Sequence, residues 1–505
     1  MKKVFRNCLL LGTLLMSTVV GVQAEHLVFI AVNDTHSQID PASDGQGGLL
    51  RRRAIFDKVR SDNKYTLTVH AGDAVQGTTF FSLYGGEVEY ALMDSLGYDV
   101  IILGNHEFDN GLDSIYHFYK DIKAEKLCAN YDFSATKLHK IFKPYYIKAV
   151  GDKRVGVFGI NIEPKGLIAD KNYPGLRYIR SIDVADATAR YLKETLGCDY
   201  AVMVSHIGYD SYNPTEPNDT MIIRNSHYID LVIGGHSHTV IKPGSEFAQI
   251  PNADGRLITV GQNGKSGKLV GVYDMDLDNG NVVYSHIKVD NSWDKAAEEY
   301  TDLKAWLGHY RNGVDSLMNH VVGRSVVELP HKSDLLTNWV SDITLDIIKD
   351  LSGYKVDLAI MNKGGIRCAM PAGDITEGLL DSMFPFDNRY MVLEMSGKDL
   401  LEALGVMAGR GGDALSRGMM VTYDKSGKVL SAKLNGKKID PKKMYKVATI
   451  DYLANGGDYM VPLTRAKRLY EDEQKYGIHV LNYVKELTAA GKQIKSVNEQ
   501  RMQCK

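Results

Sequence analysis

The sequence lacks the features of a nucleic-acid-binding protein and of a small zinc or disulfide scaffold. Its 60 basic residues face 62 acidic ones, a net charge of −2, so it has no basic excess for a nucleic-acid polymer. It contains only five cysteines, and none forms a CxxC pair. Neither repeats nor low-complexity linkers interrupt its 505 residues. What remains is an ordinary globular composition, 44% hydrophobic and 24% charged, long enough for two or more domains with large cores.

The apolar run near the N-terminus is too short to span a bilayer. It covers residues 9–20, follows three basic residues, and precedes the small-residue stretch Val22-Gln23-Ala24. This pattern is typical of a secretory signal peptide at residues 1–24, with a buried N-terminal helix as the alternative. Cys8 stands too early for lipid attachment at the cleavage point. We therefore expect an exported protein, in the periplasm, at the cell surface or secreted, with no stable membrane anchor.

Four cysteines follow the predicted signal peptide, namely Cys128, Cys198, Cys368 and Cys504. An exported compartment permits one or two disulfides among them. Buried free thiols are an equally acceptable interpretation, and both alternatives are open at this point.

Apolar runs typical of buried strands alternate with helical patterns through the first half of the chain. Strands are expected at residues 26–33, 65–71, 100–103, 126–130, 154–161, 199–205 and 229–233, and helices at 49–60, 87–96, 113–124 and 184–196. The alternation predicts a layered α/β domain with catalytic loops at one edge. After about residue 255 the pattern becomes β-rich, with strands expected at 257–261, 269–277 and 282–289.

A single long helix is expected at residues 294–318, where apolar residues recur at spacings of three and four. Such a helix packs on a domain face or bridges two domains, and its position between two sets of elements favours a bridge. The second set has helices at 334–350 and 397–407 and strands at 356–361, 419–423, 428–434 and 444–449.

Side chains that can bind metals follow five of the expected strands. They are Asp34, His36, Asp73, Asn105, His206, His236 and His238. A single residue of this kind is usually structural, but the carboxyl ends of strands in open α/β sheets are where ligands bind, and here five such ends carry ligand chemistry. Seven ligands suit two metal ions. Mixed nitrogen and oxygen donors favour Zn²⁺, Mn²⁺, Fe or Co over Ca²⁺.

The motifs around these residues resemble the five blocks of the calcineurin-like metallophosphoesterases. They are NDTH at 33–36, GD at 72–73, GNHEFD at 104–109, SH at 205–206 and GGHSH at 234–238. Their order and the form of GNHEFD resemble the exported 5'-nucleotidase family, which includes bacterial periplasmic UDP-sugar hydrolases. The resemblance implies a dinuclear site. One metal would take Asp34, His36, Asp73 and His238, and the other Asp73, Asn105, His206 and His236.

The resemblance also implies a fold. An N-terminal calcineurin-like α/β/β/α metallophosphoesterase domain of four layers would be followed by a bridging helix and a C-terminal 5'-nucleotidase-type α/β substrate-binding domain. We place the signal peptide at 1–24, the catalytic domain at 25–293, the bridging helix at 294–320 and the substrate-binding domain at 321–505.

Two residues of the GNHEFD motif are predicted to be catalytic rather than metal ligands. By resemblance, His106 stabilises charge on the transferred phosphoryl group and Asp109 orients its imidazole; a helix cap is the alternative for Asp109. Glu107 is interpreted as structural support. Two cations about 3.5–4 Å apart lower the pKa of a bridging water and clamp the phosphoryl oxygens, so the chemistry implied is attack of a metal-activated water on phosphorus.

The predicted substrate-binding residues lie in the second domain. Asn362, Gly365 and Arg367 belong to a segment that resembles the family's Asn-x-Gly-Gly-x-Arg, and the arginine fork suits a phosphate or carboxylate. Asp458 and Tyr459 come from a second family block. Asp458 is expected to accept from ribose hydroxyls or to cap a turn.

Three positions depart from the family. Asp413 stands where an aromatic ring usually stacks on the nucleobase, and the ring of the second loop is shifted to Tyr459 or replaced by Met460. Before residue 334 only Lys332 replaces the usual phosphate-binding arginines. The loss of one stacking ring removes about 1–3 kcal/mol per base.

We therefore expect a metal-dependent phosphoric ester hydrolase whose partner is a small phosphate ester, most simply a 5'-nucleotidase acting on nucleoside monophosphates. The main alternative is the same chemistry on a UDP-sugar, a 2',3'-cyclic nucleotide or another phosphometabolite, because the departures fall in substrate loops. A non-catalytic surface binding protein would have lost ligands, and all seven are present. A sulfur-handling relative would need a cysteine near the site, and no cysteine lies in the metal blocks.

Overall fold

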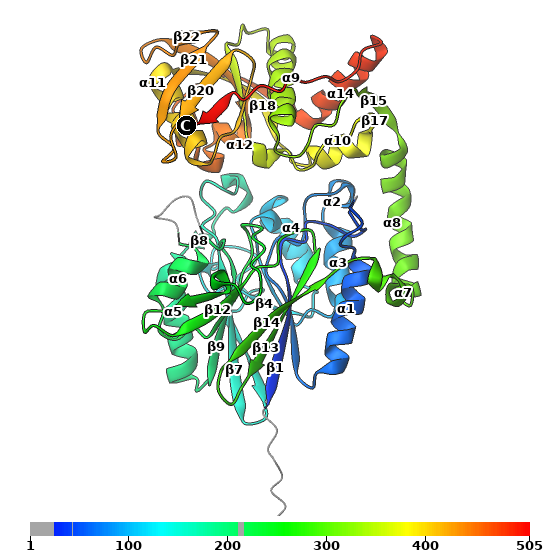
Figure 1. Cartoon of the computed structure of the whole chain (residues 1–505), viewed down its shortest axis with the longest axis vertical. Helices are drawn as coiled ribbons and strands as arrows, with labels where there is room; N and C mark the ends of the chain where they lie inside the picture. The colour runs from blue at the N-terminus through cyan, green and yellow to red at the C-terminus, as the bar shows by residue number, and fades with distance from the viewer. Residues whose placement is uncertain (1–24, 43, 211–216) are drawn as a thin grey trace, which may run out of the picture.

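The computed structural model describes residues 25–42, 44–210 and 217–505. The predicted signal peptide lies outside the described residues. The chain forms two bodies stacked along the long axis of the molecule (Figure 1). The N-terminal body contains strands β1–β14 and the C-terminal body strands β15–β25, and the long helix α8 runs along one side from the first body to the second.

Two six-stranded sheets form the centre of the N-terminal body. The first has the order β14-β13-β1-β2-β3-β4 and the second the order β11-β12-β10-β9-β7-β6. In the first, β1 to β4 are parallel and β13 and β14 are antiparallel additions. In the second, β7, β9, β10 and β12 are parallel and β6 and β11 are the antiparallel edges. Parallel strands place their carboxyl ends at one edge, which is where the site forms.

The strands of these sheets have the following bounds: β1 His26–Val32, β2 Thr66–His70, β3 Val100–Ile102, β4 Glu125–Leu127, β6 Tyr145–Val150, β7 Lys153–Asn161, β9 Tyr200–His206, β10 Leu231–Ile233, β11 Gln249–Pro251, β12 Leu257–Gly261, β13 Leu269–Asp276 and β14 Val282–Lys288.

The alternation of side chains along β1 explains the four layers. Leu27, Phe29 and Ala31 enter the core shared with the second sheet. Val28 and Ile30 enter a separate core with helices α1 (Leu49–Asp62), α3 (Glu87–Leu96) and α4 (Gly111–Tyr119). Because successive strand residues point to opposite faces, one strand serves both cores. Helices α5 (Ser181–Arg190) and α6 (Asp219–Asn225) cover the second sheet, so the expected α/β/β/α arrangement is confirmed.

The C-terminal body has one core and two main sheets. A five-stranded sheet has the order β19-β16-β23-β18-β24, and a four-stranded sheet the order β22-β21-β20-β25. Helices α9 (Asp334–Ser352), α10 (Glu377–Met383), α11 (Gly397–Gly409) and α14 (Tyr476–Ala489) pack on this core. Helix α9 begins where the Ser333 hydroxyl accepts a hydrogen bond from the Leu336 amide, 3.3 Å.

The remaining bounds are β15 Val321–Ser325, β16 Leu358–Met361, β17 Gly373–Thr376, β18 Arg389–Ser396, β19 Ala414–Leu415, β20 Met419–Tyr423, β21 Val429–Leu434, β22 Lys437–Lys438, β23 Met444–Ile450, β24 Lys467–Lys475 and β25 Met502–Cys504.

The prediction of one continuous helix at 294–318 is wrong. Helix α7 covers Asp294–Ala297 and α8 covers Thr301–Asn319. Tyr300 between them has φ −85° and ψ 56°, outside the helical region, and its hydroxyl donates to the Asp57 carboxylate of α1 at 2.9 Å. This contact holds the chain in a bend before α8 starts. Along α8, Leu307 and Val314 are buried against the N-terminal body.

The four described cysteines are all free thiols, and Cys128 and Cys198 are buried. Of the two alternatives for these residues, the structure therefore has the free thiols. Within the described ranges, none of the helices combines the length and apolar character needed to cross a membrane.

Candidate metal centre

The seven predicted metal ligands lie in loops at the carboxyl ends of five strands. Asp34 and His36 follow β1, Asp73 follows β2 and Asn105 follows β3, while His206 ends β9 and the last two, His236 and His238, follow β10. The first sheet thus provides four candidates and the second sheet three. The two sheets bring them together at one edge of the N-terminal body.

Asp34, His36, Asp73 and His238 form a first group, whose ligand atoms all lie within 4.8 Å of one another. The Nε2 atoms of His36 and His238 are 2.9 Å apart, and His238 Nε2 is 3.3 Å from Asp34 Oδ1. Two imidazole nitrogens and two carboxylates converging on one point are the mixed donor set of a borderline divalent cation. The residues present therefore fit a metal ion.

Asp73, His206 and His236 form a second group, whose ligand atoms also lie within 4.8 Å of one another. His206 Nδ1 donates a hydrogen bond to the Ala71 carbonyl at 2.7 Å. Its Nε2 is therefore the atom that can bind a metal, and it lies 3.2 Å from Asp73 Oδ2. Asn105 Oδ1 lies 2.9 Å from His236 Nδ1 and joins this group. Asp73 belongs to both groups, so its carboxylate lies between them.

Most of the candidate ligands have an unusual backbone conformation. Five of the seven have positive φ angles between 46° and 82°: Asp34, His36, Asp73, His236 and His238. This region is costly for residues other than glycine, by about 1–3 kcal/mol each, and it persists where the surrounding structure fixes it. The folded chain therefore holds these side chains at some cost to its stability, as functional sites commonly do.

Two glycines allow the loops to approach closely. A Cβ on Gly104 would collide with the carboxylate and backbone nitrogen of Asp73, and one on Gly72 would meet His206 Nδ1 at 2.5 Å. Gly72 also has φ +82°. Only glycine lets the loops after β2 and β3 meet here.

The charge states of Asp34, His36 and His236 suit a metal ion, whereas at His206 the carboxylates of Asp73 and Asp34 outweigh burial and raise the pKa to about 10. Burial acts to raise the pKa of Asp34, but the imidazoles of His238 and His206 outweigh it and hold that pKa well below its usual range. Burial lowers the pKa of His236 to about 3, and also lowers that of His36. Ionised carboxylates and neutral imidazoles are the forms that bind metals.

Two residues that orient the centre were missed from the sequence. Asn33 Nδ2 donates to Asp34 Oδ2 at 2.6 Å and to the Gly264 carbonyl at 2.8 Å. Gln262 Nε2 donates to the Gly235 carbonyl at 2.7 Å, next to His236. Asn33 lies in the NDTH motif, so its position was a usable signal. Gln262 lies outside every motif and acts through the tertiary fold alone.

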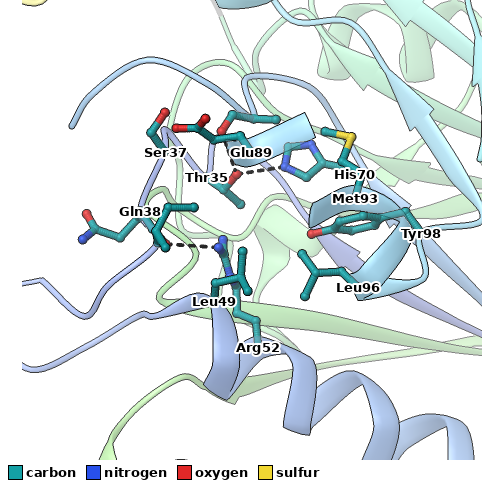
Figure 2. Close-up of a pocket in the computed structure, with 12 residues that line it drawn as sticks. Thr35, Ser37, Gln38, Leu49, Arg52, His70, Glu89, Met93, Leu96 and Tyr98 are labelled. Carbon is teal, nitrogen blue, oxygen red and sulfur yellow. Dashed lines mark hydrogen bonds between the residues drawn. The ribbon is translucent and has the colours of Figure 1, made fainter. Parts of the chain in front are cut away.

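A small cavity lies behind the loop that carries His36 (Figure 2). Its volume is about 20 Å³, enough for one water. Within the described structure, Arg52 Nε and Nη1, both carboxylate oxygens of Glu89 and the Ser37 hydroxyl have no hydrogen-bond partner, and all three residues line this cavity. Arg52 Nη2 also donates to the Gln38 carbonyl at 3.1 Å. This hydrogen bond connects α1 to the loop that carries His36.

Glu107 connects the loop after β2, which carries Asp73, to the loop after β3, which carries Asn105. Its carboxylate accepts from the amides of Ala74 at 2.8 Å and Asp73 at 3.1 Å, and also from the amide of Gly104. The side chain is 3% exposed, so no solvent could replace it. Its interpretation as structural support agrees with these contacts.

Replacing Glu107 with alanine is expected to destabilise the fold by at least about 3 kcal/mol, because each of the three buried amides left unsatisfied costs about 1–3 kcal/mol. Urea unfolding of the metal-free protein measures this loss. Glu89→Ala is the matched control, since Glu89 is also buried but bonds to no backbone amide of the metal loops. An equal loss of unfolding free energy in both variants would contradict the structural role assigned to Glu107.

His106 and Asp109 form a pair next to the ligand groups. His106 Nδ1 is 2.9 Å from Asp109 Oδ2, and the His106 amide donates to Asp73 Oδ1 at 2.9 Å. Burial acts to lower the pKa of His106, but the carboxylates of Asp109 and Asp73 outweigh it and raise that pKa. His106 is in neither ligand group. Its imidazole is therefore available as a proton-bearing group beside the centre.

The C-terminal body brings Arg367 to the same place. The ring of Phe386 stacks on His106 at 5.8 Å, and the Arg367 guanidinium carbon lies 5.7 Å from the Phe386 ring. No role for Phe386 was predicted from the sequence. The two bodies also meet where the Thr79 and Ser382 hydroxyls of α2 (Thr79–Tyr84) and α10 are 2.8 Å apart.

The remaining predicted substrate residues form a charged network instead of an open base pocket. Asp458 accepts hydrogen bonds from Asn362 Nδ2 at 2.7 Å, Arg410 Nη2 at 2.8 Å and the Tyr452 hydroxyl at 3.0 Å. Asp413, at the position of an expected stacking ring, pairs with Arg410 at 3.1 Å. The Asp458 carboxylate is therefore already occupied by protein donors.

The last two predicted residues lie at the edges of this network. Gly365 packs on Asn362, because a Cβ there would be 2.7 Å from Asn362 Oδ1. Tyr459 has φ 61°, and its ring faces Gly166 of the N-terminal body, 3.4 Å from where a Cβ would stand. The Asp458 amide donates to the Gly166 carbonyl at 2.8 Å, so this loop connects the two bodies.

Comparison with known proteins matches both bodies. A calcineurin-like phosphoesterase model matches residues 27–240, and a 5'-nucleotidase C-terminal domain model matches residues 317–464. An apyrase of Tabanus yao is 27% identical over 93% of this chain and 90% of its own length. The 5'-nucleotidase of Homo sapiens is 27% identical over 86% of this chain and 84% of its own length.

A solved structure has the same two-body architecture. The 5'-nucleotidase precursor of Thermus thermophilus is 27% identical, with a TM-score of 0.82 over 95% of this chain and 99% of that one. Together, the two matched domains, these relatives and the metal-binding motifs show that the chain belongs to the 5'-nucleotidase family of calcineurin-like metallophosphoesterases, which are phosphoric ester hydrolases.

Proposed function

We propose that the chain is an exported dinuclear-metal phosphohydrolase that acts as a 5'-nucleotidase, releasing phosphate from nucleoside monophosphates. The observation that carries this proposal is the carboxylate of Asp73, shared by two ligand groups while His106 stands beside both. Export is supported by the signal-peptide pattern of residues 1–24. In this proposal residues 25–293 catalyse, residues 294–320 link the domains and residues 321–505 hold the substrate.

Asp34, His36, Asp73 and His238 would hold one ion, and Asp73, Asn105, His206 and His236 the other. When bound, ions of the Zn, Mn, Fe or Co class activate a water and neutralise phosphoryl oxygens. The Asp73 carboxylate belongs to both ligand groups, so it would be shared by the two ions. The Ala71 carbonyl fixes the His206 tautomer, and Asn33 orients Asp34.

His106 and Arg367 would contact the phosphoryl group from outside the metal positions. His106 bears a proton that Asp109 holds in place, so it donates to a phosphoryl oxygen as charge develops in the transition state. The Arg367 fork binds a non-bridging oxygen. Phe386 packs against both and excludes water from that side.

A second candidate keeps this chemistry but takes another ester, such as a UDP-sugar or a 2',3'-cyclic nucleotide. The charged contacts among Arg410, Asp413 and Asp458 favour it, because they replace the aromatic sandwich that the resemblance leads us to expect around a nucleobase.

A panel of substrates separates these proposals. Phosphate release is measured from nucleoside monophosphates, a nucleotide sugar, cyclic nucleotides and an aryl phosphate, before and after chelation and with each metal restored. We expect monophosphate hydrolysis that chelation abolishes and Zn²⁺ or Mn²⁺ restores. Activity that survives complete metal removal would refute the metal-dependent mechanism. Activity restricted to other esters would refute the proposal that nucleoside monophosphates are the substrates.

A further inference from the structure

The turn after β12 lies between the segments that carry two members of the first ligand group. We call residues 262–266 of this turn the ligand turn. On one side, the Ser266 amide donates to the Asp34 carbonyl at 2.7 Å. On the other side, the Gly264 amide donates to the carbonyl of the residue after His238 at 3.0 Å. The backbone of the ligand turn therefore helps to set the positions of both metal-binding segments.

Asn33 joins the ligand turn to the carboxylate of Asp34. The side-chain oxygen of Asn33 accepts from the Asn263 amide at 2.9 Å, and its Nδ2 donates to the Gly264 carbonyl at 2.8 Å. The same Nδ2 donates to Asp34 Oδ2 at 2.6 Å. All of these groups are buried, so water does not replace a bond that is lost. The orientation of the Asp34 carboxylate therefore depends on where the backbone of the ligand turn lies.

The side chain of Asn263 holds this backbone from the core of the N-terminal body. Asn263 is 2% exposed, and its Oδ1 accepts from the Tyr284 hydroxyl at 3.0 Å. Its Nδ2 makes a longer bond, 3.5 Å, to the Ala31 carbonyl. The Tyr284 hydroxyl is the stronger of these two partners, because hydrogen bonds weaken beyond about 3.2 Å.

Tyr284 is itself held firmly on β14, the edge strand of the first sheet. Its ring belongs to the core shared by the two sheets and stacks on Tyr273 of β13, with centroids 4.5 Å apart and planes 8° apart. Its hydroxyl oxygen also lies 2.5 Å from Nε2 of His286, two residues along the same face of β14. The single hydroxyl proton is donated to Asn263, so the His286 nitrogen is the donor in this second contact. Both the ring and the hydroxyl of Tyr284 are thus fixed.

Two glycines make room for the contact between Asn263 and Tyr284. A Cβ on Gly271 of β13 would collide with the terminal atoms of the Asn263 side chain, and one on Gly261 of β12 would lie 2.7 Å from Tyr284 Cζ. Glycine weakens a strand because it has no side chain to pack. Both strands therefore lack a packing side chain at the points where Asn263 and Tyr284 need the space.

We propose that Asn263 and Tyr284 are positioning residues of the metal centre. The Tyr284 hydroxyl fixes the Asn263 side chain, and through the ligand turn and Asn33 it fixes Asp34 in the geometry that binds a divalent cation. The inference rests on the proposed dinuclear-metal function and adds to it two residues that lie outside all five metal-binding motifs. Neither side chain bonds to a ligand, so they act on metal affinity through geometry.

The test compares Tyr284→Phe with Tyr200→Phe in the full chain. Each change removes one phenolic hydroxyl from the N-terminal body. Tyr200 is the matched control, because its hydroxyl donates to the Leu277 carbonyl at 3.0 Å, a bond that does not reach the ligand turn. Zn²⁺ dissociation constants are measured by competition with a chromophoric chelator. Urea unfolding of the metal-free variants measures the loss of stability.

We expect Tyr284→Phe to weaken the binding of one Zn²⁺ ion by about three- to tenfold, while Tyr200→Phe binds both ions like the wild type. Loss of a direct outer partner of a ligand costs about 10–100-fold, the effect expected for Asn33→Ala, and Tyr284 acts through two further residues. Both tyrosine variants should lose a similar free energy of unfolding, since each loses one hydrogen bond. If Tyr284→Phe showed this loss but kept the Zn²⁺ affinity of the control, its role would be structural alone and the proposal would be overturned.

A double-mutant cycle assigns the effect to the bond between the two side chains. Asn263→Ala should weaken Zn²⁺ binding at least as much as Tyr284→Phe, and the combined variant should bind no more weakly than Asn263→Ala, because both changes remove the same contact. Additive losses of affinity would mean that the two residues act independently, which contradicts the proposal. If Asn263→Ala does not fold, the comparison of the two tyrosine variants decides the question.

Metal affinity also separates this inference from the proposed function. If the wild type binds two ions but hydrolyses no nucleotide, the proposed substrate is wrong and the affinities still test the positioning role. If the wild type is an active nucleotidase and Tyr284→Phe binds Zn²⁺ equally well, only the inference fails. A wild-type chain that binds no divalent ion would overturn this inference together with the metal centre.

Discussion

Asp73→Asn should lose both metal ions and nearly all phosphatase activity. The Asp73 carboxylate is 1% exposed and is shared by both ligand groups. Asparagine keeps the shape and one oxygen, so the fold and the bond from the His106 amide should remain, but an amide cannot bridge two cations as a carboxylate does. Loss of an outer partner of a metal ligand typically costs about 10–100-fold, and loss of a bridging ligand should cost more than that.

Metal content by mass spectrometry and phosphate release over a metal titration measure this effect. Asp219→Asn is the matched control, because Asp219 is fully buried beside the end of β9, which carries His206, but accepts from the Ser205 hydroxyl at 2.6 Å and belongs to no ligand group. The control should keep its metals. If Asp73→Asn retained two ions per chain at wild-type affinity, the shared-ligand arrangement would be wrong.

The sequence predicts the layered fold because side-chain alternation and strand-end motifs are local. Residues 87–96 are helical as expected, and the ligand-bearing motifs follow β1, β2, β3, β9 and β10. The bend at Tyr300 is different. The helical pattern runs through it, and only the tertiary hydrogen bond to Asp57 accounts for the interruption. Helix 113–124 likewise ends earlier than expected, at Tyr119.

The candidate site shows the same difference between local sequence motifs, which can be predicted, and tertiary contacts, which cannot. A motif gives the type of each ligand, but not the contacts that orient it. Gln262 and Phe386 act across sequence separations of 27 and 280 residues, on Gly235 and His106 respectively. The absence of a ring at Asp413 is visible in the sequence, but its replacement by an ion pair with Arg410 becomes visible only in the folded chain.

His106→Ala should keep both metals, and its kcat should fall by about 10²–10⁴-fold. This is the range for a positioned proton donor or for one transition-state contact. His106 belongs to neither ligand group, so metal content should match the wild type. A variant that lost an ion but kept its rate per bound metal would show that His106 is a ligand instead.

Two substrates with different leaving groups distinguish the two roles that His106 could have in the reaction. If His106 stabilises charge on the phosphoryl oxygens, its removal should cost about the same for an aryl phosphate, whose phenolate leaves readily, as for a nucleoside monophosphate. If it protonates the leaving oxygen, the aryl phosphate should be much less affected. We expect similar losses, since the ring lies beside the metal loops with its Nδ1 committed to Asp109.

The pH profile of Asp109→Asn completes this test. The Asp109 carboxylate helps to raise the pKa of His106, so the protonated imidazole persists to higher pH in the wild type. Without that carboxylate the pKa of His106 falls, and the alkaline limb of kcat should move to lower pH while metal content stays constant. A profile that does not move would mean that the proton on His106 takes no part in the rate-limiting step, and His106 would then act through its position alone.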